Sequence, residues 1–209
     1  GLYRPHVPFV APEKYYELHK NKGFSVPESS NQYLNTIPEP AAISVRAKKE
    51  QIGLDSELAQ EIIQAYYATI SFVDAQIGRV LDKLTKTGLD KNTIVIFTSD
   101  HGYHLGEHGH WQKQTLFEHS TRVPLIFSGP GISSGLGPIH DPVELVDLYP
   151  TIMELVQMEI PDFVRGKSLN PYFKGSKTAI RNSALTELLV RTPQGMAQGY
   201  SIKTKRFRL

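Results

Sequence analysis

Apolar residues recur at three- and four-residue steps along residues 56–84, which predicts a long amphipathic helix. Asp55 or Ser56 can cap its start, and Gly88 suits a left-handed residue at its end. A second helical pattern covers residues 143–156, where Pro150 must lie at a helix start or a kink. The apolar positions of the first helix are Leu58, Ile62, Ile63, Ile70, Val73, Ile77, Val80, Leu81 and Leu84.

Two short apolar runs, residues 93–98 and 123–127, lack polar alternation and predict strands buried on both faces. A short helix is expected between them, near residues 115–119. Strand, helix and strand in this order favour a parallel arrangement and an α/β fold. Residues 198–209 alternate like a further strand.

The first part of the chain is rich in proline. Six of the 14 prolines lie within the first forty residues, so residues 1–45 are predicted to be irregular, with one or two helical turns at 11–20. Neither end of the sequence carries a turn or a cap. We therefore expect a piece of a longer protein.

Composition changes this picture little. The 209 residues are 40% hydrophobic and 21% charged, as in an ordinary soluble domain. The absence of cysteine excludes disulfides, thiolate metal sites and cysteine nucleophiles within this segment. No apolar run is long enough for a membrane helix, and a net charge of +2 does not suggest wholesale binding to nucleic acid.

Candidate chemistry gathers in the loop after the first predicted strand. Asp100 and His101 follow that strand directly, where open α/β sheets bind ligands. His104, His108 and His110 lie in the same glycine-rich stretch. From the residues alone, a zinc site and a solvated surface loop both remain open, because short motifs often mislead.

Several segments in order resemble the sulfatases of the alkaline phosphatase superfamily. Residues 98–102 (TSDHG), 105–109 (LGEHG) and 111–113 (WQK) resemble the second signature of that family. Residues 4–9 resemble a segment of the iduronate-2-sulfatase subgroup. Further similar stretches are 66–81, 122–126, 146–151 and 165–169.

The resemblance implies a fold and a set of site residues. It implies a mixed, largely parallel sheet between helices, with residues 1–195 in the catalytic domain and 196–209 beginning a smaller C-terminal sheet. Asp100 and His101 match two ligands of one divalent metal, which calcium fills in the family. Lys113 matches a lysine that contacts the sulfate oxygens, and His6 matches a histidine beside the sulfate and the leaving oxygen.

One part of the family's site has no counterpart in this sequence. Sulfatases need a Cys- or Ser-x-Pro-x-Arg segment, whose first residue becomes the formylglycine nucleophile, and an adjacent pair of aspartates. Neither is present here. We therefore expect this chain alone not to hydrolyse a sulfate ester.

The subgroup resemblance implies a sulfated carbohydrate as substrate, the 2-sulfate of iduronate in a glycosaminoglycan. Tyr103 and His104 are candidate substrate contacts, with His110 and Arg122 as further possibilities. The resemblance also implies a periplasmic or secreted protein, or a lysosomal one in an animal. The sequence contains no Asn-x-Ser/Thr site, which favours the bacterial setting.

Three alternatives stay open. A phosphatase or phosphodiesterase of the same superfamily would use two zinc ions, with His108 or His110 as an additional ligand. A degenerate relative would bind carbohydrate without catalysis. Nucleic-acid binding would rest on the basic residues of the final strand, which a strand edge protected from further pairing explains as well; these are Lys203, Lys205, Arg206 and Arg208.

Overall fold

The computed structural model describes residues 1–28, 31–45, 51, 53–192 and 195–209. They form two compact units, one of residues Gly1–Lys91 and Gly102–Thr115, the other of residues Asn92–His101 and Leu116–Leu209. Ser29 and Ser30, within the stretch predicted to be irregular, lie outside the described residues. Each unit is considered by itself below.

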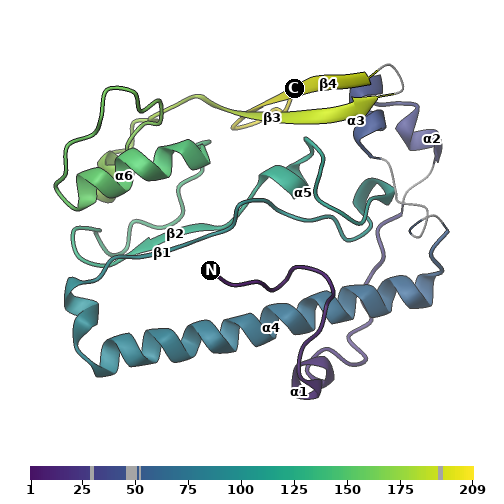
Figure 1. The fold of residues 1–209 in the computed structure, drawn as a ribbon, viewed down its shortest axis with the longest axis horizontal. Coiled ribbons are helices and arrows are strands. Elements are labelled where there is room, and N and C mark those ends of the chain that lie inside the picture. The colour runs from purple at the N-terminus through teal and green to yellow at the C-terminus, as the bar shows by residue number, and fades with distance from the viewer. Residues whose placement is uncertain (29–30, 46–50, 52, 193–194) are drawn as a thin grey trace. The chain divides into compact units, whose positions relative to one another are not determined.

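The first unit is built on the long helix α4, Ser56–Lys86, which confirms the predicted helix (Figure 1). Asp55 caps it by accepting a hydrogen bond of 2.8 Å from the backbone N–H of Leu58. Gly88 follows the helix with a φ of +72°, a conformation that glycine adopts without steric cost. A short 3₁₀ helix, η2 (Leu89–Asn92), comes next.

The N-terminal stretch contains more helix than the prolines suggest. Helix α1, Glu13–Glu17, matches the predicted turns and packs on α4, with the rings of Tyr15 and Phe72 5.4 Å apart (Figure 1). Two short helices not expected from the sequence follow, α2 (Asn31–Leu34) and α3 (Glu39–Ser44). In α3 a proline occupies the first turn, where its missing N–H costs nothing.

A buried cluster joins α4 to the loop of residues 102–115. Ala59 and Ile63 of the helix pack with Trp111 of the loop, whose side chain is buried. The loop contains the 3₁₀ helix η3, Glu107–Gly109. Gly106 has a φ of +107°, and a Cβ there would lie 3.1 Å from the Trp111 ring. Further apolar residues packed on the cluster are Phe24, Val26, Leu54, Ile62 and Leu105.

The second unit begins with two strands whose predicted direction is wrong. Strand β1, Val95–Thr98, pairs antiparallel with β2, Leu125–Ser128, and Thr98 lies opposite Leu125. The chain leaves β1 and enters β2 at the same end. A parallel pair needs a crossover of about a dozen residues or more, usually a helix. Between these strands the described residues form one short 3₁₀ helix and the α-helix α5, Glu118–Thr121. Helix α5 is a single turn, which is too short for such a crossover.

The predicted burial of β1 on both faces is also not found in this structure. Val95 and Ile96 are half-buried, whereas Phe97 and Thr98 are exposed. On β2, by contrast, side chains alternate, and Leu125 and Phe127 face the core of the unit. An apolar run therefore identified both strands but not what covers them.

That core is completed by the helical segment after β2. The 3₁₀ helix η4 (Leu145–Asp147) leads into α6 (Leu148–Leu155), so the predicted helix is confirmed and Pro150 lies in its first turn. Helix α7, Asn170–Phe173, and the residue before it supply three buried core residues. These are Leu169, Tyr172 and Phe173.

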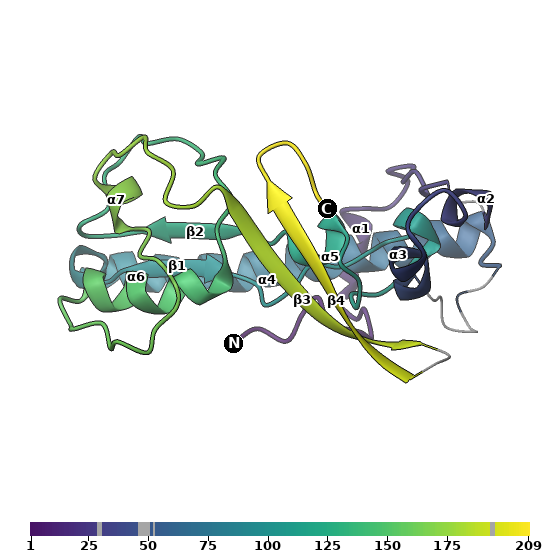
Figure 2. The same cartoon turned by 90° about the horizontal axis from the view of Figure 1, so that it is seen from above.

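The chain ends in a two-stranded hairpin of β3, Ser183–Thr192, and β4, Gly195–Thr204, paired antiparallel (Figure 2). The final strand was predicted, but its partner β3 was not. The hairpin begins before residue 196, where the sequence places the start of a smaller sheet. Among the described residues, no helix is both long and apolar enough to cross a lipid bilayer.

Candidate functional site

Asp100 and His101 lie at the end of β1, beside the start of β2. The Asp100 carboxylate accepts from the backbone N–H of His101 at 3.1 Å, and its other oxygen lies 3.6 Å from His101 Nε2. The Ser99 hydroxyl donates to the His101 carbonyl at 2.8 Å and closes the turn. The side chain of Asp100 is 85% exposed and that of His101 38% exposed, so both can reach a ligand.

This pair of donors fits part of a metal site. A carboxylate oxygen and an imidazole nitrogen at this separation can meet on one cation, and neither is buried in an apolar environment. Calcium takes about six to eight oxygen ligands. Among the described residues, no group of three or more His, Asp or Glu side chains is arranged to hold a metal. Asp100 and His101 could therefore supply at most two of the ligands that such a site needs.

His6 lies in the first unit, on an exposed stretch between two prolines. Its Nδ1 lies 2.8 Å from the Val7 carbonyl, and its ring is 5.0 Å from that of Tyr3. Because a carbonyl only accepts, Nδ1 carries the proton of this contact. Nε2 is thus the ring nitrogen that faces away from the backbone. Arg4 fixes the stretch by donating to the carbonyls of His6 and Val10.

Lys113 lies in the same unit, in the loop of residues 102–115. The backbone N–H of His104 donates to the carbonyl of Gln112 at 2.8 Å, and that of Thr115 to the carbonyl of Lys113 at 2.7 Å. The carbonyl groups on both sides of the Lys113 Cα, those of Gln112 and of Lys113 itself, thus accept backbone hydrogen bonds. The side chain is half-buried.

Tyr103 is bound into this loop. Its hydroxyl donates to the carbonyl of Trp111 at 2.8 Å. Its ring stacks on that of Tyr66 in α4 and meets the Phe9 ring edge-on, each with centroids 5.8 Å apart. Burial raises the pKa of Tyr103, and the neighbouring Tyr66 raises it further. Through Phe9, Tyr103 also joins the His6 stretch to the Lys113 loop.

His104 is fully buried, with no exposed surface. Its Nδ1 lies 3.2 Å from the Glu107 carbonyl and its Nε2 lies 2.9 Å from the Thr115 hydroxyl. Both ring nitrogens are therefore used inside the loop. The sequence makes Tyr103 and His104 candidate substrate contacts; in the structure the Tyr103 hydroxyl and both ring nitrogens of His104 bond within the loop.

His110 is the unusual member of the histidine cluster. Its side chain is buried, and neither ring nitrogen has a hydrogen-bond partner among the described residues. Burial, with the nearby His108, lowers its pKa to about 4. The ring lies 5.0 Å from that of His104, while His108 stacks on Tyr33 at 5.4 Å. His110 is thus neutral at ordinary pH.

The basic residues of the last strand are largely paired with carboxylates. Arg208 donates to Glu118 at 2.7 Å, and Lys203 lies 3.6 Å from the same group. Burial would raise the pKa of Glu118, but hydrogen bonds and charge from Arg208 and Lys203 hold it below its usual range. Lys205 pairs with Asp141. These contacts give Lys203, Lys205 and Arg208 a structural role.

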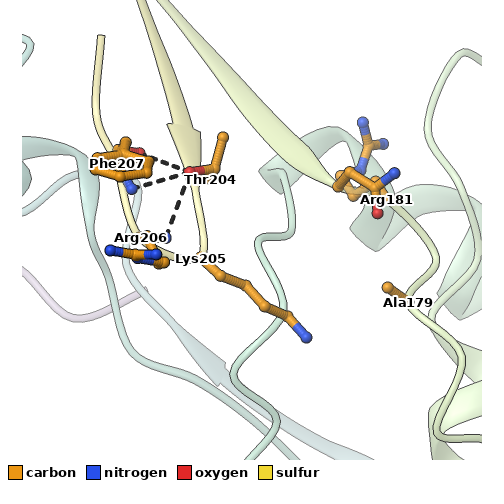
Figure 3. Close-up of a pocket in the computed structure, with 7 residues that line it drawn as sticks. Ala179, Arg181, Thr204, Lys205, Arg206 and Phe207 are labelled. Atoms are coloured by element: carbon orange, nitrogen blue, oxygen red, sulfur yellow. Dashed lines mark hydrogen bonds between the residues drawn. The ribbon is translucent and has the colours of Figure 1, made fainter.

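A pocket of about 350 Å³ lies near the end of β4 (Figure 3). Thr204 closes the turn beside it, accepting from the backbone N–H groups of Arg206 and Phe207. The guanidinium of Arg181, on the opposite wall, forms ion pairs with Asp147 and Glu144. None of the residues predicted from the sequence to form the site lines this pocket; its lining is Ala179, Arg181, Asn182, Thr204, Lys205, Arg206 and Phe207.

The structure therefore distributes the predicted residues over its two units. Asp100 and His101 lie together in the second unit, and His6 and Lys113 both lie in the first. Thr115 was not singled out from the sequence. In the structure it contacts both Lys113 and His104. The sequence signal for such a role was its position two residues after Lys113.

Comparison with known proteins places the chain among sulfatases. Residues 1–158 match the family model described as Sulfatase. A sulfatase of Formosa agariphila is 39% identical over 173 residues, which cover 81% of this chain and 34% of that protein. Human iduronate 2-sulfatase is 31% identical over 198 residues, covering 77% of this chain and 36% of that protein. The chain thus spans about a third of the length of these curated relatives.

Among solved structures, the phosphonate monoester hydrolase of Silicibacter pomeroyi superposes with a TM-score of 0.85 at 29% identity. The match covers 99% of this chain and 45% of that hydrolase. A protein of Bacteroides thetaiotaomicron superposes with a TM-score of 0.74 at 25% identity, over 88% of this chain and 42% of that one. These matches confirm the predicted α/β, alkaline phosphatase-like fold class, of which this chain forms a part.

Proposed function

This chain belongs to the sulfatase family, and on that premise we propose that it forms part of a sulfuric ester hydrolase. The observation that carries the proposal is the Asp100–His101 pair, exposed at the end of β1 within the family's signature segment. The segments that hold His6 and Lys113 are built in the companion unit, with the Lys113 loop fixed by its own hydrogen bonds.

Asp100 and His101 would hold one divalent cation, which in our proposal is calcium. When bound, that cation stabilises negative charge on the sulfate oxygens. The exposed carboxylate of Asp100 supplies a hard oxygen donor, as calcium prefers, whereas an imidazole nitrogen is an uncommon calcium ligand. Metal analysis of the purified full-length protein distinguishes calcium from zinc.

Lys113 and His6 would act on opposite sides of the breaking ester bond. Charge develops on the non-bridging sulfate oxygens, where a fixed ammonium group stabilises it without reorganisation. The departing alkoxide needs a proton, and a histidine in position to donate one accelerates such a step by about 10²–10⁴-fold. Nε2 of His6 is suited to that donation when protonated, because Nδ1 is occupied by the Val7 carbonyl.

The nucleophile is proposed to lie outside these residues. The sequence has no cysteine and no Ser-x-Pro-x-Arg segment from which formylglycine could form. We expect the isolated chain to release no nitrophenol from p-nitrophenyl sulfate, while the full-length protein does so. Appreciable release by the isolated chain would contradict this division of the site.

For the substrate, we propose a sulfated carbohydrate, with the 2-sulfate of iduronate in a glycosaminoglycan as the first candidate. The similarity to human iduronate 2-sulfatase supports it. Residues 1–195 are assigned to the catalytic domain and 196–209 to the beginning of a smaller one. An exported location, periplasmic, secreted or lysosomal, belongs to the same proposal.

The experiment compares two ester classes in the full-length protein. Hydrolysis of p-nitrophenyl sulfate is expected to exceed that of p-nitrophenyl phenylphosphonate, to be lost with EDTA and to return with Ca²⁺. The second candidate is a phosphonate or phosphate ester hydrolase, which the structural match to the Silicibacter pomeroyi enzyme favours. Preference for the phosphonate, with zinc in the purified protein, would replace the first proposal by the second.

A further inference from the structure

Thr115 lies two residues after Lys113 and is joined to it by a backbone hydrogen bond. Its side chain is 3% exposed, so it cannot itself meet a substrate. Its N–H donates to the Lys113 carbonyl at 2.7 Å, which closes a tight three-residue turn. Its hydroxyl lies 2.9 Å from Nε2 of His104. One residue thus joins the Lys113 turn to a buried imidazole.

The hydrogen bonds fix the direction of that contact. Nδ1 of His104 faces the Glu107 carbonyl, which can only accept, so Nδ1 carries a proton. In the neutral ring Nε2 is then an acceptor, and the Thr115 hydroxyl is its donor. A hydroxyl at this position is therefore required in a way that a methyl group of the same shape cannot replace.

The backbone of His104 holds the other side of Lys113. Its N–H donates to the Gln112 carbonyl at 2.8 Å, so His104 fixes the residue before Lys113 by its backbone and the residue two places after it by its ring. The His104 side chain is completely buried, and this support has no freedom to rotate into solvent. Lys113 itself remains only half-buried.

From this geometry we infer that Thr115 is a positioning residue for Lys113, acting with His104 to hold the lysine at the site of sulfate transfer. The inference rests on the proposed function of Lys113. Small displacements of a group that stabilises a transition state reduce turnover strongly, whereas binding of the ground state is affected less. Loss of the Thr115 hydroxyl should therefore lower kcat more than it raises KM.

The test uses Thr115→Val and Thr115→Ser in the full-length protein, with p-nitrophenyl sulfate as substrate. The valine variant is expected to lose about tenfold in kcat, well below its melting temperature, with KM changed less than about twofold. The serine variant keeps the hydroxyl and is expected to stay close to the parent. Thr69→Val is the matched control, because Thr69 is likewise buried and its hydroxyl also forms a hydrogen bond. That bond goes to the backbone carbonyl of Tyr66 in α4, away from Lys113 in the sequence.

A double-mutant cycle with Lys113→Ala separates positioning from a general structural effect. If Thr115 acts through the lysine, Thr115→Val has no further effect on kcat once Lys113 is alanine. Equal fold losses in both backgrounds, or equal losses in the serine and valine variants, would overturn the inference.

Hydrogen exchange provides a readout that does not depend on activity. Thr115→Val is expected to speed amide exchange at residues 112–115, whereas Thr69→Val leaves it unchanged there. Should the parent hydrolyse no sulfate ester, the proposed function fails. Unchanged exchange at residues 112–115 in the valine variant would separately refute the support itself. A valine variant that does not fold is replaced by Thr115→Ala in the same measurements.

Discussion

The buried imidazole of His110 makes the stability of the first unit, which contains the loop of residues 102–115, depend on pH. Burial and His108 lower its pKa to about 4, from an ordinary value of 6.5. The unfolded chain takes up a proton at the higher of these values and the folded chain only at the lower. Between them the unfolded state binds more protons, so the free energy of unfolding falls as the pH is lowered.

The magnitude follows from the size of the shift. With one pKa unit equal to about 1.4 kcal/mol, the shift of about 2.5 units contributes about 3 kcal/mol when fully expressed. At pH 5 the unfolded imidazole is almost fully protonated and the folded one is not, so about 2 kcal/mol is already lost relative to pH 8. His110 is only 3% exposed, so solvent does little to reduce this figure.

Replacement by leucine tests this reasoning, because it keeps an apolar side chain of similar volume and removes the titration. Urea unfolding of the full-length protein at pH 8 and pH 5 is the measurement. We expect the parent to lose about 2 kcal/mol more between these pH values than His110→Leu does. His140→Leu, which removes an exposed imidazole, serves as control. An identical loss in the parent and in His110→Leu would refute the account of a buried histidine with no partner among the described residues.

Three further changes have expected outcomes. Lys113→Ala should lower kcat for an aryl sulfate by about 10²-fold or more, because it removes a fixed cation from the developing sulfate charge; initial rates in the full-length protein measure this. Arg181→Leu should lower the free energy of unfolding by about 3–5 kcal/mol, because it leaves the fully buried Asp147 without its cation; an unchanged melting curve would contradict this. Gly166→Ala should destabilise the second unit by more than about 1 kcal/mol, since a Cβ there would lie 2.0 Å from the Val146 carbonyl oxygen; thermal unfolding followed by circular dichroism tests it.

The sequence alone determined the elements that depend on local pattern. The three- and four-residue spacing of apolar side chains located α4, and Asp55 and Gly88 marked its ends, because capping and left-handed turns act within a few residues. The Asp100–His101 motif at the end of a strand was likewise recognisable, since it rests on neighbouring residues.

What only the tertiary structure decided depends on contacts between distant residues. The apolar runs that predict β1 and β2 carry no record of direction, and the long connection between them folds back instead of crossing over. The spacing of the histidines could not reveal that both ring nitrogens of His104 form hydrogen bonds, with Thr115 and Glu107. Nor could it reveal that those of His110 have no partner among the described residues. Hydrogen-bond satisfaction is set by which polar atoms meet after burial, and no periodicity of side chains encodes it.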